Sequence, residues 1–159
     1  MIVMALSCNP KLLIADEPTS ALDALTQLQF IKLLKNLEKE LNMSFLIISH
    51  SIYLIANLCK KVAIMYSGNI VELGSIETIL KKPMHPYTKG LMKSIPKLTG
   101  RIEKLEAIEG EVPDPLCTPA GCPFHPRCAY KNKKCQKENP RLVEVTKDHF
   151  VRCHLVGRG

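Results

Sequence analysis

The stretch KLLIADEPTSALD, at residues 11–23, decides the fold class of this chain of 159 residues. It begins as a short apolar run that ends in a carboxylate, which is typical of a buried strand in a parallel sheet. Such sheets bind ligands at the carboxyl ends of their strands, and Asp16 and Glu17 stand at that end here. A second apolar run, SFLIIS at residues 44–49, is followed directly by His50. The sequence therefore predicts two buried strands with chemically useful side chains at their ends.

Helical periodicity alternates with these apolar runs. Leucine or isoleucine recurs at three- and four-residue steps between residues 25 and 41, which predicts an amphipathic helix. Further helices are expected at 52–58, 76–80 and 87–93, and the apolar runs at 61–66 and 70–74 predict a hairpin around Gly68. The alternation indicates an α/β layer with a mostly parallel sheet.

Read together, DEPTSALD and His50 resemble the ABC ATPases, whose Walker B strand, D-loop and switch histidine follow in this order and at about this spacing. The resemblance implies that Asp16 holds Mg²⁺ through water and that Glu17 polarises the water that attacks the γ-phosphate of ATP. It implies that His50 stabilises the charge developing on that phosphate, that Asp23 lies in the D-loop facing a partner subunit, and that Ser20 contributes to nucleotide binding. Phosphoryl transfer needs these residue types because its catalysis is mostly positioning and electrostatics.

The phosphate-binding half of that enzyme is not found in this sequence. A phosphate loop needs GxxxxGK followed by Ser or Thr, but the first glycine of the chain is Gly68. The Gly-rich ABC signature is also missing, and MIVMALSCNP at residues 1–10 resembles the helix that follows it. We therefore expect a partial P-loop NTPase layer that, taken alone, neither hydrolyses ATP nor stays monomeric. A truncated, inactive product is an alternative interpretation.

Four sequence motifs in the second half resemble one branch of the ABC ATPases, the ATP-binding subunits of oligopeptide and dipeptide importers. Nickel and glutathione importers are closely related to this branch. The four motifs are HPYTKGLMKSIP (85–96), EGEVPDP (109–115), GCPFHPRC (121–128) and VRCHL (151–155). We accordingly expect residues 1–80 to be the C-terminal portion of the nucleotide-binding domain and residues 81–159 to be a small importer-type extension. The resemblance implies a second ATPase subunit and transmembrane permease subunits as partners, an extracytoplasmic solute-binding protein as an indirect one, and a peripheral position on the cytoplasmic face of the membrane.

The extension carries four cysteines, Cys122, Cys128, Cys135 and Cys153, at intervals C-x5-C-x6-C-x17-C. This spacing is wider than the C-x2-C pairs of zinc ribbons. Because the segment from residue 121 to 155 offers little for an ordinary core, the cysteines suggest a metal in its place. In the resembling importers this tail is associated with a 4Fe-4S cluster. Zinc and ordinary reduced thiols remain alternatives.

The net charge of +7 lies in the second half, where 16 Lys and Arg residues face 8 Asp and Glu residues; the first 80 residues carry 6 against 7. A solvated basic surface explains this charge, and so does contact with anionic lipid. A metal-bearing module that binds nucleic acid is a competing interpretation. It leaves DEPTSALD unexplained, and with aromatic residues at 5% and no tryptophan there is little to build a stacking surface for bases, so no nucleic-acid partner is expected.

Overall fold

The computed structural model describes residues 2–94, 108–114 and 116–156. Prolines and glycines multiply and periodicity fades over residues 95–119, which predicts an extended connection; residues 95–107 and 115 of it lie outside the described range. The chain forms two compact units, residues 1–60 and 61–159. This division falls 20 residues before the boundary predicted between residues 80 and 81. The predicted boundary separates the nucleotide-binding domain from the importer-type extension, and it stays a prediction.

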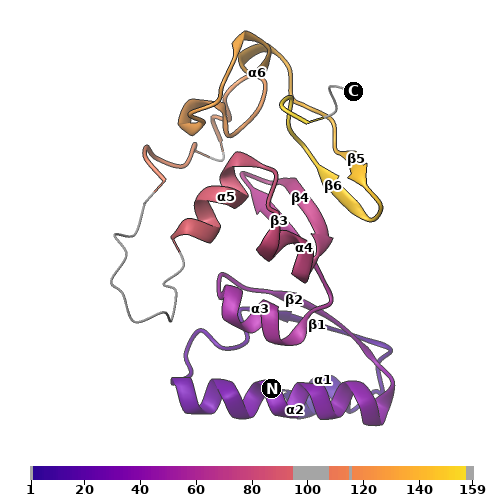
Figure 1. Ribbon diagram of the computed structural model, residues 1–159. Helices are drawn as coiled ribbons and strands as arrows, with labels where there is room; N and C mark the ends of the chain where they lie inside the picture. The colour runs from indigo at the N-terminus through magenta and orange to yellow at the C-terminus, as the bar shows by residue number, and fades with distance from the viewer. Residues whose placement is uncertain (1, 95–107, 115, 157–159) are drawn as a thin grey trace, which may run out of the picture. The chain divides into compact units, whose positions relative to one another are not determined.

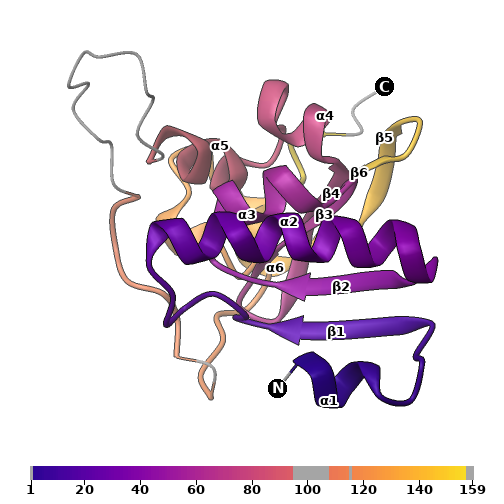
Figure 2. The same ribbon diagram turned by 90° about the horizontal axis from the view of Figure 1, so that it is seen from below.

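Over its described residues, 2–60, the first unit forms α1 (Ile2–Leu6), β1 (Leu12–Asp16), α2 (Ala24–Leu41), β2 (Ser44–Ile48) and α3 (Ile52–Leu58) in this order. Strands β1 and β2 are parallel, with Leu12 opposite Ser44 and Asp16 opposite Ile48, and Figure 2 shows them side by side and pointing the same way. The predicted strands and the long helix are confirmed to within one or two residues. The carboxyl ends of both strands consequently meet at one edge of the sheet.

Side chains alternate between a covered and an open face of this sheet. Leu13 is buried, as are Ile31 and Leu34 of α2 and Leu54 and Ile55 of α3, so the helices supply the core of the unit. The opposite face carries four apolar side chains that are 50–60% exposed: Leu12, Ile14, Leu46 and Ile48. Strands with apolar side chains on both faces are typical of a sheet that is covered on both sides. Here only one face is covered, so the unit presents an open apolar face.

The second unit is built on an antiparallel sheet. Its elements are β3 (Lys61–Tyr66), β4 (Asn69–Ser75), α4 (Ile76–Lys81), α5 (Pro86–Lys93), η1 (His125–Arg127), α6 (Lys133–Lys137), β5 (Val143–Thr146) and β6 (His149–Val151). The strand order is β3-β4-β6-β5. Ser67 and Gly68 turn the β3–β4 hairpin with φ of 43° and 72°, as a tight hairpin turn requires. The hairpin and both helices predicted there are confirmed.

The prediction of little ordinary core beyond residue 120 is wrong. The β5–β6 hairpin, yellow in Figure 1, extends the sheet because Glu72 and Leu73 of β4 pair with Val151 and Phe150 of β6. A hydrophobic cluster joins both ends of the unit and contains Tyr66, Val71, Cys122, Phe124 and Cys135. The prediction failed because this pairing links residues almost 80 positions apart, which local patterns do not report.

The predicted α/β class is confirmed in its coarse form, since helices and strands mix in both units. The expectation of a mostly parallel sheet holds only for β1 and β2, because all pairings in the second sheet are antiparallel. Within the described residues, no helix is both long enough and apolar enough to cross a membrane.

Candidate functional site

Glu17 and His50 meet at the carboxyl edge of the β1–β2 sheet. Glu17 follows β1 with a φ of 43°, and its backbone N–H donates to the Ile48 carbonyl at 2.8 Å. Its Oε1 accepts the backbone N–H of His50 at 2.9 Å, and its Oε2 lies 2.9 Å from His50 Nδ1. Positive φ is uncommon outside glycine and is concentrated at functional sites. Glu17 is thus held at its backbone by Ile48 and at its carboxylate by His50.

The Glu17 carboxylate is ionised at neutral pH. The side-chain hydrogen bond from His50 lowers the pKa of this carboxylate most; desolvation opposes it, and the His50 backbone N–H, the His50 charge and the Ser49 hydroxyl lower the pKa further. The side chains remain open, with 80% of His50 and 36% of Glu17 exposed. Because the second ring nitrogen of His50, Nε2, has no partner among the described residues, it can meet an anion that arrives from solvent.

The other predicted nucleotide-binding residues lie nearby along the chain but take local roles. Ser20 donates from Oγ to the Glu17 carbonyl at 3.1 Å. Asp23 caps α2: its Oδ1 accepts the Thr26 N–H at 2.9 Å and its Oδ2 accepts the Thr26 hydroxyl at 2.8 Å. These bonds, the backbone one first, lower the pKa of Asp23. Asp16 ends β1 exposed to solvent, so its carboxylate is accessible to a hydrated cation.

The four predicted metal cysteines converge in the second unit. Cys122, Cys128, Cys135 and Cys153 all line one shallow recess. The Cys122 N–H donates to the Cys135 carbonyl at 2.8 Å, so the first and third cysteines are joined through the backbone. All seven cysteines of the chain are free thiols. The fold therefore gathers side chains that lie up to 31 positions apart.

Burial keeps the thiols of Cys122, Cys128 and Cys153 protonated at neutral pH. It raises the pKa of Cys122 and of Cys128, and it raises that of Cys153 to about 11. Mutual repulsion among the cysteines adds to the effect for Cys153. A metal that binds thiolates would have to displace those protons. Among residues 2–94, 108–114 and 116–156, no three His, Cys, Asp or Glu side chains are arranged to hold a single metal ion, so the predicted metal site stays a prediction.

Comparison with known proteins places both halves of the chain. Residues 71–135 match the family model described as "Oligopeptide/dipeptide transporter, C-terminal region". Over 155 residues, or 98% of its length, the chain is 46% identical to the oligopeptide transport ATP-binding protein AppD of Bacillus subtilis. It is 45% identical over its whole length to the dipeptide transport ATP-binding protein DppD of Caldanaerobacter subterraneus.

The chain is a relative of peptide-transport ATP-binding subunits. This confirms the resemblance predicted from DEPTSALD and from the sequence motifs of the second half. The match covers 47% of AppD and 49% of DppD, so the chain spans about half the length of the curated relatives it matches. The stretch that fits the family model contains Cys122, Cys128 and Cys135, while Cys153 lies beyond it.

Sequence reasoning missed a buried polar cluster in the peptide-transporter region. Glu72, fully buried on β4, accepts three hydrogen bonds: from Met84 N at 2.8 Å, from His85 N at 3.0 Å and from His149 Nε2 at 2.8 Å. His85 is also buried, and burial lowers its pKa to about 4 against the opposing effect of Glu72. The one signal in the sequence was a glutamate inside the apolar run of β4, where a buried carboxylate requires donors.

Proposed function

We propose that this chain supplies the hydrolytic residues of a Mg²⁺-dependent ATPase that powers peptide import. The relatives that support this are named for ATP binding and for oligopeptide or dipeptide transport. The partners would be a second ATPase subunit and transmembrane permease subunits at the cytoplasmic face of the membrane, with an extracytoplasmic solute-binding protein acting through the permease. The phosphate loop would come from sequence outside these 159 residues, and the chain by itself would not turn over ATP.

The contact between Glu17 and His50 carries this proposal. An ionised Glu17 carboxylate is an acceptor for the proton of an attacking water. His50 Nδ1 lies 2.9 Å from that carboxylate, so in the form protonated on both ring nitrogens it would donate from Nδ1 to Glu17 and from Nε2 to a γ-phosphate oxygen where negative charge develops. Asp16 would bind Mg²⁺ through water, Ser20 would support the loop against the nucleotide, and Asp23 would face the partner subunit from the N-cap of α2.

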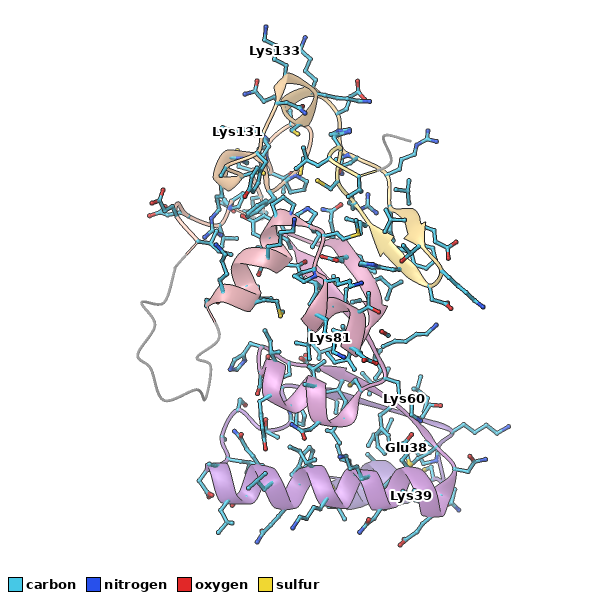
Figure 3. The ribbon with its side chains drawn as sticks, viewed as in Figure 1. Glu38, Lys39, Lys60, Lys81, Lys131 and Lys133 are labelled. Carbon is cyan, nitrogen blue, oxygen red and sulfur yellow. The ribbon has the colours of Figure 1, made fainter. Side chains whose placement is uncertain are left out.

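Mutation of Glu17 in a chimera tests the hydrolytic role. In the chimera, this chain replaces the matching part of the Bacillus subtilis relative, and Mg²⁺-ATPase turnover is measured. General-base catalysis contributes about 10²–10⁴-fold, so Glu17→Gln should reduce kcat by at least about 100-fold while Mg²⁺-ATP still binds. The matched control is Glu38→Gln, because Glu38 pairs with Lys60 at 3.0 Å instead of with His50 (Figure 3). A chimera that binds Mg²⁺-ATP without hydrolysing it, or one whose Glu17→Gln variant keeps its rate, would contradict the proposal.

We further propose that the four-cysteine recess holds a 4Fe-4S cluster. Four thiols on one recess provide the ligand set that such clusters use. When bound, the cluster would supply one-electron redox chemistry and a rigid cross-link between the segments that carry the cysteines.

Metal analysis separates cluster from zinc. Anaerobically purified chain should be coloured and contain about four iron and four sulfide per molecule. Replacing Cys135 by Ser should abolish both, whereas replacing the exposed Cys117 should leave both unchanged. Colourless, iron-free protein with one zinc per chain would establish the zinc alternative instead.

A further inference from the structure

Much of the positive charge of the second half gathers around one short helix, α6. Between residues 116 and 143 the single acidic residue is Glu138, against six lysines and arginines. One of the six, Arg127, is occupied, because its guanidinium donates to the carbonyls of Ile108 and Glu109 at 2.7 and 2.9 Å. The other five are exposed and lie on α6 or within four residues of its ends. They form the basic surface: Lys131, Lys133, Lys134, Lys137 and Arg141.

Helix α6 turns three of these lysines to one side. With about 3.6 residues per turn, Lys133, Lys134 and Lys137 fall on one face of the helix, and Cys135 falls on the opposite face. Cys135 is buried in the hydrophobic cluster of the unit, so the lysine face is the outer one. Figure 3 shows Lys133 extending away from the body of the second unit.

The fold does not use these charges for its own stability. Lys133 and Lys137 are four positions apart on the helix, where like charges repel, and lysines at a helix N-terminus oppose the helix dipole. Lys134 lies 3.6 Å from Glu138, but both side chains are more than half exposed, and such a pair contributes little. Among the described residues, Lys133, Lys137 and Arg141 have no partner. These cations are therefore available to an external anion.

Two exposed apolar side chains adjoin the basic surface. Tyr130, which precedes Lys131, is 63% exposed, and Leu155 is 46% exposed; both line the same recess, so they lie close together. Lysines beside an exposed tyrosine and leucine are typical of a surface that lies on a membrane, where the aromatic ring sits at the level of the headgroups. Nucleic acid fits less well, because Tyr130 is the only exposed tyrosine or phenylalanine in the described part of this unit and bases need several rings to stack on.

We propose that the basic surface binds the anionic headgroups of a lipid membrane and holds the second unit against it. The choice of lipid over another anion rests on the proposed function, because an ATPase that powers import works beside a membrane. The inference does not depend on a metal in the cysteine recess. Each lysine close to an anionic lipid surface strengthens binding about fivefold, and this attraction weakens as salt shortens the range of the charges.

Sedimentation of the 159-residue chain with lipid vesicles tests the inference. One set of vesicles is pure phosphatidylcholine, and the other contains about 30% phosphatidylglycerol, an anionic lipid. At about 0.1 M salt the chain should bind the anionic vesicles at least about 100-fold more tightly than the neutral ones, and about 1 M salt should remove the difference. A variant with three substitutions on α6 should bind the anionic vesicles about 100-fold more weakly than wild type, at about fivefold for each lysine. The substitutions are Lys133→Gln, Lys134→Gln and Lys137→Gln.

The matched control removes the same charge from the first unit. Helix α2 carries three exposed lysines, of which Lys39 is labelled in Figure 3, and their replacement should leave vesicle binding unchanged. The control substitutions are Lys32→Gln, Lys35→Gln and Lys39→Gln. Circular dichroism checks that both triple variants are folded. If the α6 variant is not, Lys137→Gln alone decides, with an expected loss of about fivefold.

Three results would overturn the inference. Equal binding to neutral and anionic vesicles would show that charge does not drive the contact. An equal loss in the α2 and α6 variants would show that total charge matters and the basic surface does not. Tighter binding of duplex or single-stranded nucleic acid than of anionic vesicles at the same salt would establish the nucleic-acid interpretation instead. ATP takes no part in these measurements, so their failure is distinct from a failure of the ATPase chimera.

Discussion

Replacing Glu72 by Gln tests the buried polar cluster of the second unit with almost no change in shape. Both carboxylate oxygens act as acceptors: Oε1 receives Met84 N and His149 Nε2, and Oε2 receives His85 N. Glutamine offers one oxygen and one NH₂ group, so at least one of these donors would face another donor. An orphaned buried donor costs about 1–3 kcal/mol, and hydrogen bonds to a charged group are worth more than neutral ones. We expect a loss of about 3 kcal/mol in the free energy of unfolding.

Urea unfolding combined with amide hydrogen exchange measures this loss at the site itself. At 1.4 kcal/mol per factor of ten, the Met84 and His85 amides should exchange about 100-fold faster in Glu72→Gln. Glu77→Gln is the control, since Glu77 is exposed and pairs with Lys81 on α4; an exposed pair of this kind contributes at most about 0.5 kcal/mol. If both variants lost less than about 1 kcal/mol, Glu72 would not be the acceptor that organises this region.

Three other substitutions give separate tests, all by urea unfolding. Gly121 has a φ of 75°, and a Cβ there would collide with the Cys135 carbonyl oxygen, whereas Gly68 has a φ of 72° and open space around it. Gly121→Ala should lower the free energy of unfolding by about 3 kcal/mol and Gly68→Ala by about 1 kcal/mol, and equal losses would contradict the close approach. Asp23→Ala should lower the free energy of unfolding by about 1 kcal/mol through loss of the α2 cap, and Asp23→Ser should restore it. An unchanged free energy of unfolding in Asp23→Ala would show that the cap is dispensable. His85 has a lower pKa in the folded chain than in the unfolded chain, so the unfolded state binds more protons as the pH falls. The free energy of unfolding of the metal-free chain should therefore decrease by up to about 3 kcal/mol between pH 6.5 and 4. His85→Gln should make this decrease smaller.

The first unit could be predicted from sequence because its helices and strands follow from local sequence patterns. The three- and four-residue steps between residues 25 and 41 gave α2, and the apolar runs before Glu17 and His50 gave β1 and β2. The parallel pairing then brings the two residues to one edge, as the motif predicted. The sequence did not reveal the positive φ of Glu17 or the use of Asp23 as a helix cap, although Thr26 at the third following position is compatible with such a cap.

The second unit was harder to predict because its organising contacts are not local. β6 is three residues long and pairs with β4 across more than 70 positions, and a strand that short has no clear periodicity. Glu72 and His149 lie 77 positions apart, and neither is informative alone. The cysteines could be singled out by type and number, but the backbone contacts that gather them appear only in the folded chain.

The wide cysteine spacing has a physical explanation in this fold. Close C-x2-C pairs let a single turn present two ligands without help from elsewhere, and this chain has none in its last 40 residues. Here the Cys122 N–H to Cys135 carbonyl bond joins two segments, and Gly121 permits it because any side chain at that position would strike the Cys135 and Gln136 backbone. The β4–β6 pairing then brings in Cys153 just after β6. The recess is therefore shaped by backbone contacts, so removal of metal should loosen it without unfolding the β3–β4–β6–β5 sheet.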